Sequence, residues 1–175
     1  TMQDLTMLGT LPGRKIIVRG NHDFWWSTVT KMTAMTHGAF EFIHNSAIQV
    51  GNVALAGTRG WISETSKKFT ETDRSIILRE EGRMARSLEL AQKMNVDKII
   101  AVLHYPPFDE ARNPSHMMDI IKEHGADQCI YGHIHGGPNF VNLPEELEGI
   151  PLHLTSADYL DFKPYFICDL EAPHA

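Results

Sequence analysis

Three short segments of this chain of 175 residues combine histidine with glycine or proline, and each follows a run of apolar residues. They read GNHD at residues 20–23, LHYPP at residues 103–107 and GHIHG at residues 132–136. Imidazole is the commonest metal ligand in proteins and exchanges protons near neutral pH, and an asparagine amide offers a hard oxygen ligand. These residue types therefore point to metal binding combined with acid–base chemistry.

The GHIHG segment carries the strongest signal, because residues two apart in an extended chain point to the same side. His133 and His135 can therefore face one site together, and the flanking glycines leave space for close approach. Two imidazoles on one side are a common arrangement of metal ligands. The alternative is a pair of buried, hydrogen-bonded histidines without a ligand.

The other two segments are weaker when each is taken alone. Asn21 or Asp23 could serve only as a helix cap, and a single histidine such as His104 at a strand end is usually structural. In α/β sheets, however, ligands bind beyond the carboxyl ends of the strands. We therefore expect Asn21, His104, His133 and His135 to converge on one place. A mixed set of nitrogen and oxygen ligands suits manganese, iron, zinc or cobalt better than calcium.

The apolar pattern predicts the elements that must position these side chains. Short apolar runs predict strands at residues 15–19, 40–43, 47–50, 53–56, 98–103, 128–131, 152–155 and 165–170. Apolar residues at helical spacing predict helices at residues 24–35, from 70 or 72 to about 94, and 115–124, and residues 1–11 resemble the tail of a helix. This alternation indicates a layered α/β fold with a mixed sheet, and the length fits one domain, residues 1–175.

The composition disfavours several classes of protein. The net charge is −6, whereas general binding of polyanions requires an excess of lysine and arginine. No apolar run approaches the roughly 18 residues that indicate a membrane span, and no leader-like segment opens the chain, so we expect a cytoplasmic protein. Cys129 and Cys168 lie in apolar runs, which favours two buried thiols over a disulfide.

The order of the motifs resembles the calcineurin-like metallophosphoesterase superfamily: GNHD, then a histidine at a strand end, then GHxH. The resemblance extends from Arg19 to about Pro164, and the segments TRGW at residues 58–61 and SADYLD at residues 156–161 look like those of small bacterial members. Asp23, and the lack of a His-Gly-Gly form at position 104, set the chain apart from the protein Ser/Thr phosphatase branch. The resemblance implies a four-layer α/β/β/α sandwich with two mixed sheets.

The same resemblance implies two divalent transition-metal ions, manganese, iron or zinc. By analogy, one ion is held by Asn21, His104 and His133, and the other by His135. His22 is then a catalytic residue that stabilises the transition state or protonates the leaving oxygen. The family also carries Asp-x-His and Gly-Asp-x-x-Asp motifs upstream of GNHD, and this sequence has neither. We therefore expect that residues upstream of Thr1, and with them the first strands of the central sheet, are missing.

Several other side chains remain open between a functional and a structural role. Arg59 lies in a turn flanked by glycine and could hold a substrate phosphate, although an ordinary surface arginine is the simpler reading. Asp158 and Asp161 follow a predicted strand and could act in the site or only in turns. Aromatic side chains near the motifs could stack on an aromatic leaving group or pack in the core: Trp25, Trp26, Trp61, Tyr105 and Phe108.

The function expected from these observations is hydrolysis of small phosphate mono- or diesters by a hydroxide that two metal ions activate. The alternative is a non-catalytic protein-interaction scaffold that keeps the fold. A nuclease is disfavoured, because Arg79, Arg83 and Arg86 alternate with Glu80 and Glu81 and so describe a solvated helix face. The physiological substrate and the oligomeric state do not follow from the sequence.

Overall fold

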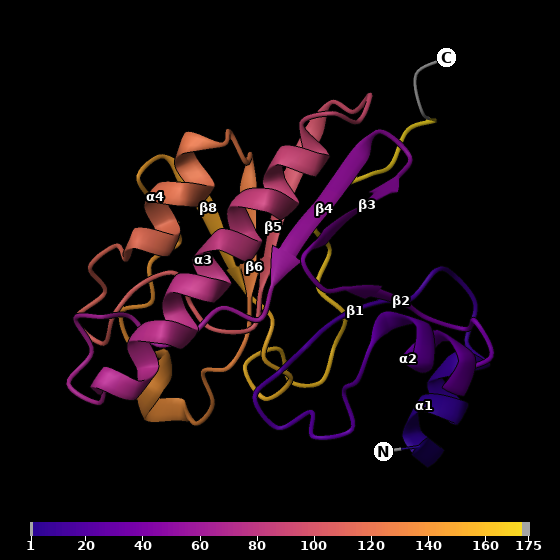
Figure 1. Cartoon of the computed structure of the whole chain (residues 1–175), viewed down its shortest axis with the longest axis horizontal. Coiled ribbons are helices and arrows are strands. Elements are labelled where there is room, and N and C mark those ends of the chain that lie inside the picture. Colours follow the sequence, from indigo (N-terminus) through magenta and orange to yellow (C-terminus); the bar gives the residue numbers. More distant parts are fainter. Residues whose placement is uncertain (1, 173–175) are drawn as a thin grey trace.

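The computed structural model describes residues 2–172, and within them helices and strands alternate along much of the chain (Figure 1). The helices are α1 (Met2–Gly9), α2 (Val29–Met35), α3 (Glu71–Ala91), α4 (His116–Glu123) and the short 3-10 helix η1 (Gly137–Phe140). The strands are β1 (Ile16–Val18), β2 (Glu41–Ile43), β3 (Ser46–Val50), β4 (Val53–Thr58), β5 (Lys98–Leu103), β6 (Gln128–Tyr131), β7 (Glu146–Leu147) and β8 (Ile150–Leu154).

The larger sheet has six strands in the order β3-β4-β5-β6-β8-β7. The four central strands β4, β5, β6 and β8 are parallel, and the antiparallel hairpins β3–β4 and β7–β8 form its two edges. Parallel neighbours require a crossover, which α3 provides between β4 and β5 and α4 between β5 and β6. The carboxyl ends of the four parallel strands therefore meet at one edge of this sheet.

The smaller sheet is the parallel pair β1–β2. Helices α1 and α2 lie beside it (Figure 1). Leu5, Trp26, Met32, Phe40 and Phe42 form its apolar core. A separate core joins α3 and α4 to the large sheet, with Met84, Leu88, Met118, Ile121 and Cys129 among its members. Strand β2 contacts β3 and β4 of the large sheet. The architecture is an α/β sandwich with two sheets, in agreement with the predicted α/β/β/α layers.

Two predicted elements need correction. The helix expected at residues 24–35 begins only at Val29, because the Asp23 carboxylate accepts hydrogen bonds from Gly20 N and Trp25 Nε1 and so holds a turn ahead of it. The strand expected at residues 165–170 does not form, and this segment is mostly exposed. The chain instead contacts the β3–β4 turn just beyond it, where Glu171 N donates to Asn52 Oδ1 at 2.9 Å.

Two simpler expectations can also be compared with the structure. No helix among residues 2–172 has the length and apolar character needed to cross a bilayer. Both cysteines are free thiols, as predicted, but only Cys129 is fully buried, whereas Cys168 is partly exposed.

Candidate active site

The GNHD, LHYPP and GHIHG segments meet in one pocket of about 360 Å³. Each segment follows a strand: GNHD comes just after β1, His104 directly follows β5, and His133 lies two residues beyond β6. The pocket is lined by Asn21, His22, His104, His133 and His135, together with Val18, Gly20 and Asp23. The structure thus brings together the five residues that the sequence analysis assigned to metal binding and catalysis.

Three of these side chains direct polar atoms at one another. His104 Nε2 lies 2.8 Å from Asn21 Oδ1 and 3.1 Å from His133 Nδ1. One ring nitrogen offers either a single proton or a single lone pair in the ring plane, so it cannot make two good hydrogen bonds to these neighbours. The Asn21 amide oxygen and the two imidazole nitrogens therefore lie close together although hydrogen bonds cannot join all three.

Both imidazoles are poised to be neutral. Burial lowers the pKa of His104 to about 4, with a further contribution from nearby His133, while Asp23 acts in the opposite direction. Burial also lowers the pKa of His133, and His135, His22 and Lys68 add to this effect. A neutral imidazole keeps the lone pair that a metal requires.

The backbone around His133 is held in an uncommon conformation. Its φ is 69°, in the left-handed region that residues other than glycine uncommonly adopt, although histidine is more frequent there than most. The surrounding hydrogen bonds fix it, since Gly132 N donates to His104 O and Ile134 N donates to Gly132 O. Such strain occurs where the fold over-determines a functional position.

Gly20 leaves little space for a side chain at this point. A Cβ there would lie 3.2 Å from Asp23 Oδ2 and 3.4 Å from the His104 ring, closer than most real Cβ contacts. Its N–H donates to Asp23 Oδ2 at 2.6 Å. The glycine therefore allows the turn that carries Asn21 to lie against His104.

His135 is oriented by a carboxylate that the sequence analysis left undecided. Its Nδ1 lies 2.8 Å from Asp158 Oδ1, and Gly136 N donates to Asp158 Oδ2 at 2.9 Å. The hydrogen bonds from Gly136 and then from His135 lower the pKa of Asp158. With Nδ1 engaged, Nε2 of His135 is the nitrogen left for a ligand. A carboxylate that fixes a metal-binding histidine in this way is a common second interaction in metal sites.

His22 lines the pocket but is exposed, and its side chain forms no hydrogen bond with another of the described residues. Its ring lies edge-on to Phe24, with 6.1 Å between the centroids. A histidine without a partner at the mouth of the pocket is free to contact a ligand there.

Arg59 occupies a different place from the one that a phosphate-binding role would suggest. Its guanidinium packs over the Trp61 ring at 4.3 Å, and Nη2 lies 3.9 Å from the buried Glu80 carboxylate. Burial lowers its pKa. It does not line the pocket that holds Asn21, His104 and His133. Its carbonyl accepts hydrogen bonds from His104 N and Tyr105 N, so it supports the site through its backbone.

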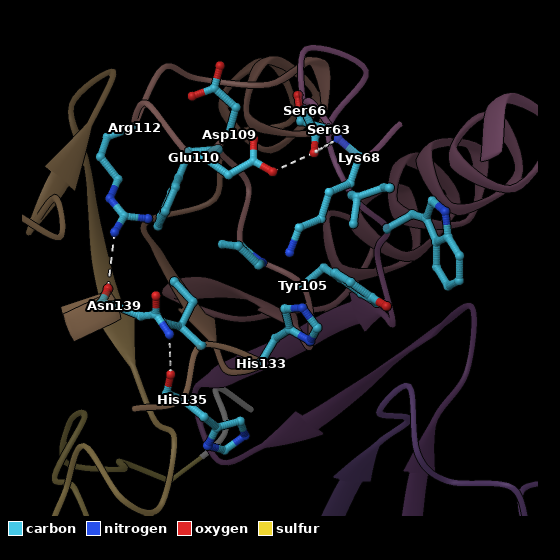
Figure 2. A pocket seen from close by; sticks show the side chains of 15 residues that line it. Ser63, Ser66, Lys68, Tyr105, Asp109, Glu110, Arg112, His133, His135 and Asn139 are labelled. Atoms are coloured by element: carbon cyan, nitrogen blue, oxygen red, sulfur yellow. Dashed lines mark hydrogen bonds between the residues drawn. The ribbon is translucent and has the colours of Figure 1, made fainter. Parts of the chain in front are cut away.

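A second pocket, of about 440 Å³, adjoins the first and shares His133 and His135 with it (Figure 2). Loop residues 61–68 and 105–112 form most of its walls. Aromatic rings of Trp61, Tyr105 and Phe108 line it, with the charged side chains of Lys68, Asp109, Glu110 and Arg112. The sequence analysis named the aromatic residues but not the charged ones, because no pattern links two separate loops.

The residues of the first pocket fit a divalent metal ion. Two ligand atoms about 2.1 Å from a shared ion and at right angles lie about 3 Å apart, which matches the observed 2.8 and 3.1 Å separations. Within residues 2–172, no three side chains of His, Cys, Asp or Glu are grouped so as to hold a metal. The third donor beside His104 and His133 is the amide of Asn21, and asparagine is not one of these residue types. His135 lies toward Asp158.

Comparison with known proteins agrees with this geometry. The family model for calcineurin-like phosphoesterases matches residues 2–137. The chain therefore belongs to the calcineurin-like phosphoesterase family, whose members carry out metal-dependent hydrolysis of phosphoesters and generally bind two divalent ions. Comparisons with curated proteins and with solved structures gave no match.

Proposed function

We propose that the pocket at the ends of β1, β5 and β6 is the active site of a phosphoesterase that acts on small phosphate mono- or diesters. One observation carries the proposal: the Asn21 amide oxygen and the His104 and His133 ring nitrogens converge within 2.8 and 3.1 Å, next to His135. Family membership supplies the general reaction class. The net charge of −6 favours small esters over long nucleic acids.

The proposal includes a role for each ligand. Asn21, His104 and His133 would hold one ion and His135 the other, with manganese, iron and zinc all compatible with these donors. When bound, such ions supply Lewis-acid chemistry and lower the pKa of water. Asp158 would fix the ring of His135, and the burial of His104 and His133 keeps their lone pairs available.

His22 is the proposed proton donor. It lines the pocket, is exposed, and its side chain forms no hydrogen bond with another described residue. Protonation of the leaving oxygen by a positioned histidine contributes about 10²–10⁴-fold to the rate of such reactions.

The proposed place of action is the cytoplasm. The free thiols of Cys129 and Cys168 accord with its reducing environment.

The decisive experiment measures metal content and hydrolysis together. The protein is purified, incubated with manganese, and analysed for metal per chain and for hydrolysis of 4-nitrophenyl phosphate and bis(4-nitrophenyl) phosphate. We expect roughly two ions per chain and turnover of at least one ester. The preferred ester separates a monoesterase from a diesterase. A metal content near zero, with no turnover, would overturn the proposal and favour the non-catalytic scaffold.

A further inference from the structure

The second pocket is placed to receive whatever extends from a phosphate bound at the first. It shares His133 and His135 with the first pocket, so a group leaving the site in that direction enters it directly. The Tyr105 ring lies against the His133 ring with 4.1 Å between the centroids, and Trp61 lies 5.2 Å beyond Tyr105. Its wall next to the site is therefore aromatic.

Most charged groups in this pocket are already engaged by the protein. The Asp109 carboxylate accepts hydrogen bonds from Thr65 Oγ1, Ala111 N, Asn113 N and Asn113 Nδ2, at 2.8 to 3.2 Å. Glu110 accepts one from Ser66 Oγ at 2.5 Å. Arg112 donates to the carbonyl of Asn139 at 3.1 Å and lies over the Phe108 ring. These charges hold the two loops and have partners within the protein.

Lys68 differs from these three. Within residues 2–172 its ammonium forms no hydrogen bond or ion pair, and the side chain is exposed. Figure 2 shows it reaching from the upper loop toward Tyr105 and His133. An unpaired cation that faces a polar pocket is available for an anionic ligand.

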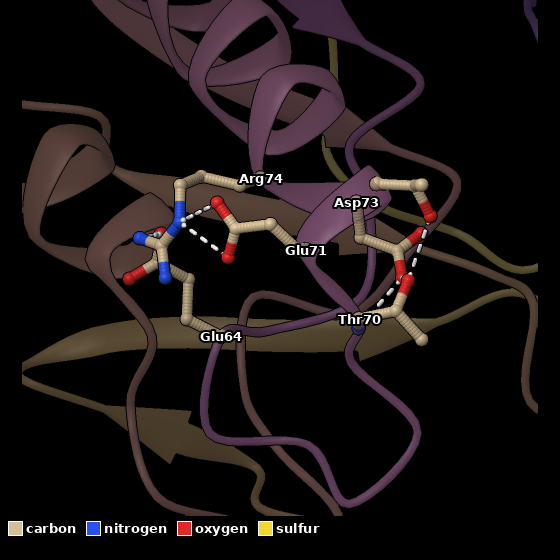
Figure 3. A network of polar contacts seen from close by, with 6 residues as sticks. Glu64, Thr70, Glu71, Asp73 and Arg74 are labelled. Atoms are coloured by element: carbon tan, nitrogen blue, oxygen red, sulfur yellow. Dashed lines mark hydrogen bonds and ion pairs between the residues drawn. The ribbon is translucent and has the colours of Figure 1, made fainter.

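The loop that carries Lys68 is fixed along its length. Lys68 N donates to Ser66 Oγ, and Ser66 Oγ donates to Glu110 on the opposite loop. At the start of α3, the Asp73 carboxylate accepts hydrogen bonds from Thr70 N and Oγ1 (Figure 3) and from Trp61 Nε1. A fixed backbone reduces the ordering cost of bringing the Lys68 ammonium to a ligand.

We propose that this second pocket binds the leaving group of the ester and that Lys68 pairs with a second anionic group on it. The proposal rests on the function proposed above and narrows its substrates to esters whose leaving group carries a further phosphate or carboxylate. The aromatic wall accommodates a planar leaving group between that anion and the scissile phosphate. A solvated surface lysine with no ligand is the competing explanation, and the experiment below separates the two.

Binding is measured by calorimetry with two hydrolysis-resistant ligands, 4-carboxybenzylphosphonate and its neutral amide, 4-carbamoylbenzylphosphonate. The two differ only in charge at the far end. The variants are Lys68→Gln and, as a matched control, Lys67→Gln on the neighbouring exposed lysine, which does not line the pocket. All proteins are loaded with manganese.

We expect the wild-type protein and Lys67→Gln to prefer the carboxylate by about fivefold, the size of a solvent-accessible ion pair. Lys68→Gln should bind both ligands about equally while keeping its affinity for the neutral amide. An unchanged preference in Lys68→Gln, or no preference in the wild-type protein, would overturn the proposal.

Hydrolysis and metal content, measured on the same preparations, keep this inference distinct from the proposed function. If the protein binds metal and hydrolyses 4-nitrophenyl phosphate but does not prefer the carboxylate, the proposed function stands and only the role of Lys68 is wrong. If the protein prefers the carboxylate through Lys68 but hydrolyses no ester, the anion-binding role of Lys68 stands and the proposed phosphoesterase function is wrong.

Discussion

The two adjoining pockets are built by different means. The first is placed by the ends of β1, β5 and β6, and its polar atoms converge without a full set of hydrogen-bond partners. The second is placed by two loops, and both of its carboxylates accept hydrogen bonds from the protein, whereas the Lys68 ammonium is left unpaired within the described residues. A sheet edge gives the fixed geometry that ligation needs, whereas loops supply recognition that can differ between relatives.

The largest expected effect comes from removing a donor of the first pocket. His104→Ala deletes the nitrogen that lies between Asn21 and His133, and loss of a direct ligand should exceed the 10–100-fold cost typical of outer partners. We expect metal per chain to fall by about one ion and ester turnover to be lost. Elemental analysis and an ester assay check this.

The control for this variant is His116→Ala, on an exposed histidine at the start of α4 that pairs with Glu81. Its metal content and turnover should match the wild-type protein. Full metal content in His104→Ala would show that the convergence of these three side chains is a structural contact only.

His22→Ala should separate chemistry from ligation in the same pocket. We expect kcat to fall by about 10²–10⁴-fold, the range for a lost proton donor, while metal content is unchanged. The reason is that His22 lines the pocket, yet its side chain forms no hydrogen bond with the three converging donors. Steady-state kinetics with parallel elemental analysis gives the answer, and loss of metal would reassign His22 as a ligand.

Asp158→Asn should have an intermediate effect. The carboxylate orients His135 from outside the pocket, and removing such a partner costs about 10–100-fold in metal affinity. The matched control is Asp161→Asn, on an exposed aspartate nearby that pairs with Lys163. Metal titration should show weakened binding of one ion in Asp158→Asn and no change in Asp161→Asn. Equal affinities in both variants would place Asp158 outside the metal site.

The first pocket was predictable from the sequence because its residues follow apolar strands. The parallel neighbours β5 and β6 bring their carboxyl ends to one edge, so His104 and His133 had to meet once these strands were recognised. This rule does not place Asn21, because Asn21 follows β1 of the smaller sheet. The same rule extends to Asp158, which follows β8, the parallel neighbour of β6. The sequence pattern placed it after a strand but could not select it over Asp161, since the choice depends on the turn that follows.

The second pocket could not be predicted in this way. Lys68 and Asp109 lie in irregular loops whose paths are set by side-chain hydrogen bonds between distant residues, and such bonds leave no periodic pattern. The same limit explains the late start of α2, where the hydrogen bonds of Asp23 outweigh the helical spacing of the apolar residues. Likewise, an apolar run at residues 165–170 formed no strand, because apolar character does not provide a neighbouring strand.

Asp109→Ala tests whether the loops of the second pocket depend on their buried carboxylate. The side chain is 8% exposed, and its removal leaves several hydrogen-bond donors without a partner. We expect a loss of about 2 kcal/mol in the free energy of unfolding at neutral pH, measured in urea. Metal binding at the strand ends should persist, and its loss would show that the two pockets are not independent.

The pH dependence of this loss has a definite sign. Burial raises the pKa of Asp109, but the hydrogen bonds from Asn113, Thr65 and Ala111 outweigh it, and the pKa is lowered overall. A group whose pKa is lower in the folded state stabilises the protein above its ordinary pKa and loses that effect as the pH falls through the folded value. The difference between the wild-type protein and Asp109→Ala should therefore shrink in acid, and a constant difference would contradict this assignment.

The smallest effect is expected at Arg74, an exposed residue near the start of α3 (Figure 3). Its guanidinium lies 3.1 Å from Glu71 and 3.5 Å from Glu64, but all three side chains are about half exposed or more. Exposed ion pairs contribute little because water and salt screen them, so Arg74→Gln should lower the free energy of unfolding, measured in urea, by about 0.3 kcal/mol.

Asp73→Asn, one residue earlier, weakens the hydrogen bonds that fix Thr70 and Trp61 and should lower the melting temperature further. Since Trp61 lines the second pocket and the ion pairs of Arg74 do not, only Asp73→Asn should also change the near-UV circular dichroism. Equal effects of the two variants would mean that the whole first turn of α3, and not its pocket-facing side, determines the stability of this region.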